Sequence, residues 1–440
     1  MQQANLLKPE SPLEILLLDT KIIPAVAEVI SEAAPVERLP ETESEMSHSN
    51  IDIMEAHLNK RFDFRYNKVI GQIEYKFKEE SKYIILSDYI ANSILRELQK
   101  NKIGAYSTSL RSLLNSNFSE VYDPFVEYFN SLPEWDGQTD HIAALAATVK
   151  TNDDELWQAC FKKWLVAMVA CALDDETINH TVIVFSGKQG VGKTTWMLNL
   201  IPDQLKTYKF SGTINPNNKD TIIQLSECML INLDELENLN KSEIGSLKEL
   251  ITKNGIRIRR PYGINNENLP RRASFAGSVN SKQFLNDTTG SRRFLCFESL
   301  EINFNHEIDL SKVYAQAYHL FKSKEFKFWF DQEEIEKISA NNEQYSVVSV
   351  EEELLLSNYE PAEVEGCTLF LSATAIATAL AEKANLNITD SMVNKLGRAL
   401  KKNKFHRLKR KNRWIYAMKL KDVELAGYQS RFRMETDLPE

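Results

Sequence analysis

The sequence predicts an α/β fold built around a central sheet of mostly parallel strands. Two observations support this fold class. Four apolar segments rich in β-branched or aromatic residues recur through the middle of the chain, at "TVIVFSG", "CMLINLDEL", "RRASFAGSVN" and "RRFLCFES", and such runs are typical of strands buried on both faces. Helical patterns separate most of these segments, and alternating strands and helices build a parallel sheet.

The composition is ordinary for a globular protein and excludes several classes. Of 440 residues, 43% are hydrophobic and 26% are charged, and the formal net charge is −9. A chain of this length usually forms two or three domains. The five cysteines form no CxxC pair, which excludes a zinc ribbon and favours buried thiols in a reducing cytoplasm. The longest apolar run, "LVAMVACAL", is too short to span a bilayer, so we expect a cytoplasmic protein without a membrane segment.

Changes in composition predict the division of the chain. An apolar burst, "LEILLL", and an acidic stretch with Pro and Ser precede residue 51 and are typical of a tether. A hairpin pattern in "FRYNKVIGQIEYKF" and capped helical patterns follow. We predict an acidic flexible segment at 1–50, an N-terminal region at 51–150, an α/β core at 151–330, a linker at 331–345, a C-terminal domain at 346–425 and a tail at 426–440.

The first apolar strand leads into a phosphate-binding loop. The stretch "GKQGVGKT" fits the P-loop pattern, and it follows a strand and opens a helix, as the motif requires. Such a loop surrounds phosphates with backbone N–H groups, its lysine reaches the β- and γ-phosphates, and its Thr binds Mg²⁺. ATP and Mg²⁺ are therefore the predicted cofactors, with Thr194 as a metal ligand. The predicted nucleotide-binding residues are Gly187, Lys188, Gln189, Gly190, Val191, Gly192, Lys193, Thr194 and Thr195.

The second strand ends in two acidic residues. "MLINLDE" places Asp234 and Glu235 at the carboxyl end of a strand, beside the expected P-loop. We predict that Asp234 binds Mg²⁺ and that Glu235 polarises the attacking water. A carboxylate placed as a base for water implies hydrolysis rather than transfer to a substrate. The alternative is that Asp234 caps the helix that follows.

The third and fourth strands carry further candidates. "FAGSVN" ends in Asn280, whose amide would orient the lytic water if its strand lies between the two strands already named. A turn asparagine is the alternative. Arg292 and Arg293 precede the fourth strand in "GSRRF". They are either surface charge or, in an oligomer, an arginine finger that contacts the γ-phosphate held by a neighbouring subunit.

The ordered set of motifs resembles one family. "GKQGVGKTTW", "LINLDEL", "RRPYG", "PRRASFAGSVN" and "LNDTTGSRRF" are together similar to the virulence-associated protein E family. That family resembles the superfamily 3 helicases of viruses and plasmids, within the AAA+ ATPases. The segments "RYNKVIGQIEY" and "PFVEYFNSLPEWDG" also resemble its helicase-proximal region, so the resemblance covers about residues 55–300.

The resemblance implies a hexameric, ring-forming, DNA-translocating ATPase encoded by a phage or similar mobile element. It implies an AAA+ P-loop core at 151–330 and a helicase-associated collar at 51–150. By this resemblance the catalytic residues are Lys193 and Thr194 (Walker A), Asp234 and Glu235 (Walker B), Asn280 (sensor 1) and the finger Arg292 or else Arg293. No primase domain is recognisable, so a separate primase or initiator is an expected partner.

A predicted hairpin between the second and third strands carries basic residues. In "ITKNGIRIRRPYGINN", two arginines alternate with two isoleucines and turn signals flank them. The resemblance to superfamily 3 helicases implies that such a hairpin projects into the channel of the ring and grips one DNA strand, with cations on phosphates and an aromatic on a base. The predicted contacts with single-stranded DNA are Lys253, Arg257, Arg259, Arg260 and Tyr262. A solvated edge strand protected by its charges is the alternative.

The C-terminal segment predicts a winged helix. Residues 395–413 contain ten Lys or Arg and no Asp or Glu. Helical patterns in "SATAIATALAEKA" and "ITDSMVNKLGRALKKN", the second capped by Thr389 or Asp390, precede an alternating pattern in "FHRLKRKNRWIYAM". In a winged helix the second helix lies along a groove of duplex DNA and the hairpin contacts phosphates. The predicted contacts are Lys395, Arg398, Lys401, Lys402, Lys409, Arg410, Lys411 and Arg413; a solvated basic face is the alternative.

We therefore predict an ATP-driven DNA helicase or translocase that acts in the replication of a mobile element and binds single-stranded and duplex DNA. One alternative is an ATPase whose C-terminal domain recognises DNA for regulation or defence, without processive unwinding. Another is a non-enzymatic assembly protein with a degenerate site, which the intact Lys193, Asp234, Glu235 and Asn280 argue against.

Overall fold

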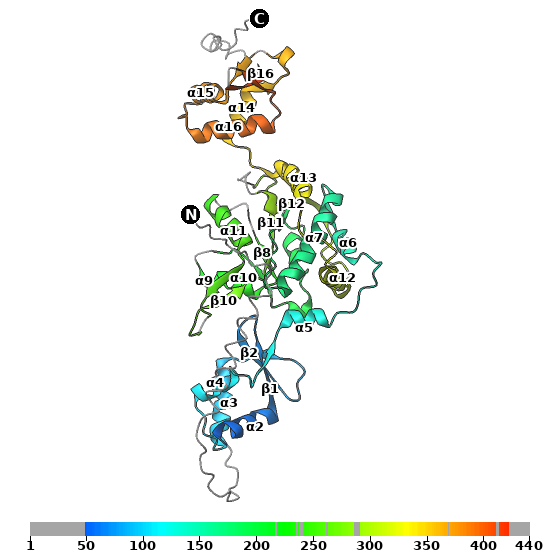
Figure 1. Cartoon of the computed structure of the whole chain (residues 1–440), viewed down its shortest axis with the longest axis vertical. Helices are drawn as coiled ribbons and strands as arrows, with labels where there is room; N and C mark the ends of the chain where they lie inside the picture. Colours follow the sequence, from blue (N-terminus) through cyan, green and yellow to red (C-terminus); the bar gives the residue numbers. More distant parts are fainter. Residues whose placement is uncertain are drawn as a thin grey trace, which may run out of the picture. The chain divides into compact units, whose positions relative to one another are not determined.

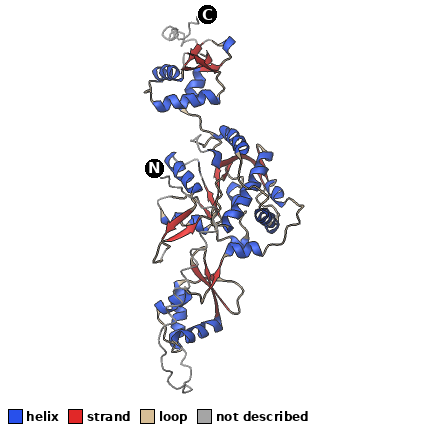
Figure 2. Cartoon of the chain, in the orientation of Figure 1, coloured by secondary structure: helices blue, strands red, loops and turns tan. Residues whose placement is uncertain are grey.

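The protein has the α/β fold class that the sequence predicted (Figure 1). The computed structural model describes residues 49–215, 218–234, 236, 241–260, 263–285, 291–367, 369–410 and 413–421. Helices and strands alternate through most of these residues (Figure 2). The chain divides into two compact units, one of residues 1–63 and 75–118 and the other of residues 64–74 and 119–440.

Helices form most of the described part of the first unit. They are α2 (Asn50–Arg61), α3 (Asp88–Lys100) and α4 (Ser107–Leu114). α2 begins with a capping box in which the side chains of Ser49 and Asp52 each accept a hydrogen bond from the other residue's backbone N–H. This arrangement satisfies two of the backbone donors that a helix start leaves free.

Four strands form the first sheet, in the order β3-β2-β1-β4. Their bounds are β1 (Phe62–Asn67), β2 (Gln72–Phe77), β3 (Ile84–Ile85) and β4 (Glu120–Tyr122). β1 and β2 are neighbours joined by a turn that the backbone bond from Gly71 N to Asn67 O closes at 2.8 Å. The hairpin predicted from "FRYNKVIGQIEYKF" is therefore confirmed.

The central sheet has six strands in the order β5-β12-β6-β11-β8-β7. They are β5 (Val149–Thr151), β6 (Val182–Ser186), β7 (Lys209–Ser211), β8 (Leu230–Leu233), β11 (Ser274–Val279) and β12 (Phe294–Ile302). All neighbouring pairs are parallel except β5 with β12. The four strands predicted from sequence are β6, β8, β11 and β12, and each residue of β6, β8 and β11 is buried, which explains their continuous apolar sequences.

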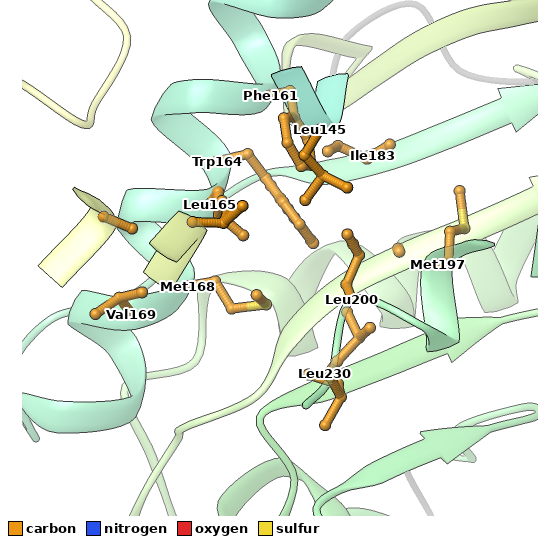
Figure 3. Packing of buried hydrophobic residues seen from close by; sticks show 14 of the residues in the cluster. Leu145, Phe161, Trp164, Leu165, Met168, Val169, Ile183, Met197, Leu200 and Leu230 are labelled. Carbon is orange, nitrogen blue, oxygen red and sulfur yellow. The ribbon is translucent and has the colours of Figure 1, made fainter. Parts of the chain in front are cut away.

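Helices lie on both sides of this sheet (Figure 1). One core cluster contains residues from α5 (Pro124–Asn130), α6 (His141–Ala146), α7 (Asp154–Leu173), α8 (Lys193–Leu198) and α12 (Leu310–Ser323). Figure 3 shows part of this cluster, with Trp164 and Met168 of α7 near Leu200 and Leu230. The second cluster contains residues from α10 (Gln224–Glu227), α11 (Lys241–Thr252), β9 (Gly255–Ile258) and β10 (Glu267–Pro270).

The core begins earlier in the chain than the predicted boundary at 150/151. Phe125 of α5, Ile142 and Leu145 of α6 and Val149 of β5 belong to the same buried cluster as α7. β5 is also an edge strand of the central sheet. Residues 124–150 are therefore part of the core, because a helix or strand belongs to the domain in which it buries its apolar face.

The segment predicted as a linker, 331–345, is folded. It forms α13 (Gln332–Asn342) and the 3-10 turn η5 (Glu343–Tyr345). Asn342 Nδ2 donates hydrogen bonds to the carbonyl oxygens of Ser291 and Phe294 at 2.8 and 2.7 Å, and Tyr345 is fully buried in the second cluster. The linker prediction is therefore wrong, since this segment packs on the sheet.

The C-terminal region has a hydrophobic core of its own. Its elements are α14 (Val350–Asn358), β13 (Tyr359–Pro361), β14 (Leu369–Leu371), α15 (Ala373–Ala384), α16 (Asp390–Lys402), β15 (Arg407–Arg410) and β16 (Arg413–Leu420). β16 lies between β13 and β14 and also pairs with β15. The predicted succession of helix, helix and hairpin is present, and Thr389 is the residue that caps α16.

The remaining short elements are η2 (Asp203–Leu205), α9 (Lys219–Ile222), η4 (Ser291–Arg293) and η6 (Val364–Gly366).

Four of the five cysteines are buried, as predicted: Cys160, Cys171, Cys228 and Cys296. Cys367 is partly exposed. α7 is long and apolar enough to cross a membrane, but 67% of its apolar window is buried in the protein. The core helix of a globular protein can have the same length and apolar composition. The burial of α7 in the first cluster accounts for both features.

Trp157 lies at the centre of the first cluster, and its removal tests the packing of the sheet. Its ring contacts the rings of Phe161, Phe185, Trp196 and Phe297, and its Nε1 donates to Ala146 O at 2.9 Å. Trp157→Ala is expected to lower the free energy of unfolding by roughly 3–5 kcal/mol. Urea unfolding measures this free energy. Trp329→Ala is the matched control, because the Trp329 side chain is 58% exposed; it should change the free energy of unfolding by less than about 1 kcal/mol.

Candidate functional site

The loop predicted to bind phosphate connects β6 to α8. Gly187, Gly190 and Gly192 have φ angles of 142°, 84° and 91°, a region that L residues with a side chain rarely adopt. Lys188, Gln189 and Gly190 are exposed, and Val191 is half-buried. The glycines are thus required by the backbone path that carries the chain from the buried strand into the helix.

An aromatic ring fixes the end of this loop. A Cβ atom on Gly192 would collide with the ring of Phe304, and Asn199 Nδ2 donates to Phe304 O at 3.2 Å. Phe304 was not predicted from sequence, because it lies beyond β12 and belongs to no phosphate-binding motif. Its contact makes the absence of a side chain at Gly192 a steric requirement as well as a conformational one.

Lys193, the first residue of α8, points back across the loop. Its ammonium group donates to the carbonyl oxygens of Gly187 and Lys188 at 2.7 and 2.8 Å and lies 3.5 Å from Asn280 Oδ1. The side chain is buried, with 7% of the residue exposed. The structure therefore brings together Lys193 and Asn280, which the sequence places far apart.

Asp234 is the centre of a hydrogen-bond cluster at the carboxyl end of β8. Its Oδ1 accepts hydrogen bonds from Thr194 Oγ1 at 3.1 Å and from Asn232 Nδ2 at 2.6 Å, and its Oδ2 accepts one from Ser211 Oγ at 2.7 Å. The Thr194 hydroxyl also lies 3.3 Å from Ser278 Oγ. The two residues predicted to bind Mg²⁺ are therefore in direct contact.

The cluster contains three side chains that were not predicted, Ser211, Asn232 and Ser278. Asn232 and Ser278 lie on the buried strands β8 and β11, and Ser211 ends β7. A polar residue inside a buried apolar strand needs a hydrogen-bond partner. That requirement is the signal by which "LINLDE" could have revealed Asn232 and "FAGSVN" could have revealed Ser278.

The side chains at this edge of the sheet suit Mg²⁺. The ion prefers oxygen ligands and is usually bound by one or two carboxylates together with substrate phosphates and water. Asp234 supplies a carboxylate, and Thr194 and Ser278 supply hydroxyl groups within 3.3 Å of each other. The described residues contain no group of three or more His, Cys, Asp or Glu side chains placed to hold a metal.

Three predicted residues, Glu235, Tyr262 and Lys411, lie outside the described residues. Thr195 is exposed on α8. Arg292 and Arg293 lie in η4, directly before β12. Arg292 is exposed, whereas Arg293 is half-buried and contributes, after burial and the charge of Arg271, to lowering the pKa of His180.

The predicted basic hairpin is present as β9 and β10, which pair antiparallel with Arg257 opposite Asn268. Ile256, Ile258 and Leu269 are buried in the second cluster. Lys253, Arg257 and Arg259 are exposed. The alternation predicted from sequence therefore gives this strand one apolar face and one basic face.

Arg260 does not belong to that basic face. Only 7% of it is exposed, and its guanidinium lies 3.0 Å from Glu227 and 3.3 Å from Glu267 and donates to the carbonyl oxygens of Lys68 and Val69. Burial raises the pKa of Glu227 to about 7, against the opposite effect of Arg260. The donors of Arg260 are directed to these partners, and its contact with DNA stays a prediction.

The basic residues of the C-terminal region separate into two groups. Lys395 and Lys402 of α16 form ion pairs with Glu351 and Glu352 of α14, at 2.8 and 3.0 Å. Burial would raise the pKa of Glu351, but the hydrogen bond from Lys395 holds it below its ordinary value. These two lysines therefore join α16 to α14, and their contact with DNA stays a prediction.

The second group lies on the surface. Arg398, Lys401, Lys409 and Arg413 are exposed and Arg410 is half-buried. The guanidinium of Arg407, which was not predicted, lies 3.5 Å from the centre of the Trp414 ring on the hairpin of β15 and β16. The exposed side of α16 and this hairpin thus carry the positive charge of the region.

Comparison with known proteins places the core in a described family. Residues 129–347 match the virulence-associated protein E-like domain. Among solved structures, an apo structure of the NrS-1 C-terminal region is 13% identical, with a TM-score of 0.45 over 85% of this chain and 99% of that chain. A second, A-form apo structure of this region is 12% identical, with a TM-score of 0.44 over 85% of this chain and 100% of that chain. The comparison with curated proteins finds no significant match.

The contact of Gly192 with Phe304 yields a test of the loop geometry. Gly192→Ala is expected to destabilise the protein more than Gly190→Ala, because both substitutions force a residue with a side chain into a positive φ but only the first meets another side chain. The conformational cost alone is roughly 1–2 kcal/mol. Thermal unfolding measures the difference. Adding Phe304→Ala to each glycine variant should reduce the extra loss of stability at Gly192 and have no such effect at Gly190; equal losses in the two single variants would contradict this geometry.

Proposed function

We propose that this chain, whose residues 129–347 match the virulence-associated protein E-like domain, hydrolyses ATP to move along or unwind DNA in the replication of a mobile genetic element. The observation that carries the proposal is the convergence of Lys193, Thr194, Asp234 and Asn280 at one edge of the central sheet. In open α/β sheets, ligands bind at the carboxyl ends of the strands, where the strand order reverses.

The strand order supports this location. β6 has β11 and β12 as its two neighbours, so the connection from β11 to β12 passes over β6. The loop that follows β6 therefore lies where the strand order reverses. The loop, the Asp234 cluster and Asn280 all follow strands that end at this edge. A nucleotide whose phosphates enter the loop would meet all three groups at once.

Each side chain has a defined part in the proposed reaction. Mg²⁺, held by Asp234 and Thr194, would supply charge neutralisation at the phosphates. Lys193 would exchange its bonds with the Gly187 and Lys188 carbonyl groups for phosphate oxygens, which are stronger acceptors for an ammonium group. Asn280 would orient the attacking water, and Glu235 would act as its base.

A neighbouring subunit would complete the site. Arg292 is exposed whereas Arg293 is half-buried, so Arg292 is the better placed of the two to reach a phosphate held by another copy. We propose a homo-oligomeric ring, because an arginine supplied in trans stabilises the charge that develops in phosphoryl transfer.

DNA would meet two basic surfaces. The first consists of Arg257 on β9 and of Lys253 and Arg259 on either side of this strand, all exposed, which suits a single strand. The second is the exposed side of α16 with Arg398 and Lys401, which suits the groove of a duplex, with the β15–β16 hairpin on the phosphates. A winged-helix domain would combine these last two contacts.

The first test concerns the chemistry. Lys193→Ala is expected to weaken ATP binding and to abolish turnover, and Asp234→Asn to retain weak binding with hydrolysis reduced by about 10² or more. Phosphate release and fluorescent-nucleotide binding measure the two effects, and Lys206→Ala, at an exposed lysine outside the site, is the control with normal turnover. Normal ATP hydrolysis by both Lys193→Ala and Asp234→Asn would contradict the proposed site. Turnover without displacement of a strand from a forked substrate would favour the regulatory or defence ATPase instead.

The second test separates the two DNA surfaces. Arg257→Glu with Arg259→Glu is expected to stop fork unwinding while duplex affinity persists. Arg398→Ala with Lys401→Ala should lower the affinity for duplex DNA. It should also reduce the slope of log affinity against log salt concentration by about 1.8, or about 0.9 for each phosphate that the variant no longer neutralises. Fluorescence anisotropy at several salt concentrations measures this. Lys395→Ala with Lys402→Ala removes the same charge from the same helix. Because these two lysines are half-buried and pair with α14, whereas Arg398 and Lys401 are exposed, a smaller change of slope is expected. Equal changes of slope in the two pairs would show that net charge alone controls binding.

A further inference from the structure

We propose that a cavity at the ends of α5, α7 and α12 binds an unpaired base and the adjoining phosphates of single-stranded DNA. The cavity has a volume of about 640 Å³ and is lined by five aromatic side chains, Tyr318, Phe321, Phe326, Phe328 and Trp329. This volume lies within the range of pockets that bind small ligands, about 300–1,000 Å³. The inference rests on the proposed function only for the choice of DNA as the ligand.

The aromatic side chains come from one short stretch. They belong to the end of α12 and to the segment that follows it, "YHLFKSKEFKFWF". The rings of Phe321 and Phe328 are 6.3 Å apart and those of Phe328 and Trp329 are 5.5 Å apart, both edge to face. Trp329 is 58% exposed. An exposed indole beside a cavity lined by aromatic rings offers a face on which a base can stack.

Lysines accompany these rings. Lys322 and Lys324 line the cavity, and Lys327 is exposed between Phe326 and Phe328. Within the described part of the chain these three form no ion pair, whereas the nearby Lys162 and Lys163 pair with Asp140 and Glu334. One aspartate, Asp174, lines the cavity as well, and its oxygens accept hydrogen bonds from Thr177 Oγ1 and Glu176 N at 2.6 and 3.1 Å. The cavity lining thus carries two lysines and one carboxylate, and Lys322 Nζ lies 5.3 Å from the centre of the Tyr318 ring.

The combination identifies a single strand rather than a duplex or a protein segment. Ring faces bind bases only where the bases are unstacked from their neighbours, and lysines that alternate with rings follow the phosphates between them. A duplex presents no open base faces. An apolar partner surface would leave the ammonium groups of Lys322 and Lys324 buried without a counter-charge, which costs free energy.

The test measures the affinity of the full chain for a labelled oligothymidylate, without nucleotide, by fluorescence anisotropy. Trp329→Ala should weaken binding by about tenfold, the loss of one base stack, and Trp329→Phe should retain most of the affinity. Lys322→Ala with Lys327→Ala should reduce the salt slope by about 1.4, or about 0.7 for each phosphate of a single strand that is no longer neutralised. Tyr89→Ala, at a tyrosine that is 79% exposed outside the cavity, is the control with unchanged affinity.

A cross-link identifies the site directly. An oligonucleotide that contains 4-thiothymidine, irradiated in the complex and digested with trypsin, should attach to the peptide 328–337, which begins after Lys327 and contains Trp329. Unchanged affinity of Trp329→Ala together with cross-links only to other peptides would overturn the inference. Loss of self-association in Trp329→Ala with unchanged DNA affinity would also overturn it, and would assign the surface to contact between copies of the chain.

The same measurements in the Lys193→Ala background keep this inference separate from the proposed enzyme. If the site at Lys193 proves inactive, the effect of Trp329→Ala on DNA affinity is still expected, because the cavity and the phosphate-binding loop share no residue. If ATP turnover follows the proposal but Trp329→Ala binds DNA normally, only the inference about the cavity fails.

Discussion

The position of one strand between two others determines the site. β11 pairs in parallel with β6 on one side and with β8 on the other, so three strands end at the same edge of the sheet. Gly277 permits this insertion, because a Cβ there would lie 3.0 Å from Leu233 O and would collide with Leu236. The contacts of Lys193 with Asn280 and of Thr194 with Ser278 both depend on that placement. The sheet therefore assembles side chains that are widely separated in sequence.

Local patterns were sufficient to predict the elements that form this sheet. The apolar runs became β6, β8, β11 and β12, and β11 lies between β6 and β8 as the interpretation of Asn280 required. These predictions succeed because burial on both faces requires a continuous apolar sequence. The capped patterns near the C-terminus became α15 and α16 for a similar reason, since helical spacing and caps are local properties.

The partners of charged side chains could not be predicted from the sequence. Arg260, Lys395 and Lys402 look like their exposed neighbours in the sequence, yet each pairs with a carboxylate on another element. The segment 331–345 looks like a linker because it is polar, but its asparagines and Tyr345 bind to the core. Ser211 and Phe304 were missed because their roles arise from contacts between distant segments. Sequence patterns reveal periodicity and local caps, whereas such pairings depend on the tertiary fold.

The buried Arg260 connects the basic strand to a distant part of the chain. One guanidinium joins the end of β9 to Glu227 of α10 and to the turn at Lys68 and Val69, and Gly71 leaves room for it, because a Cβ there would lie 2.6 Å from Arg260 Cδ. Arg257 and Arg259 therefore lie directly beside a residue that bonds to a turn far earlier in the chain. Loss of that one guanidinium would remove hydrogen bonds from the end of β9, from α10 and from the turn at Lys68 and Val69 at once.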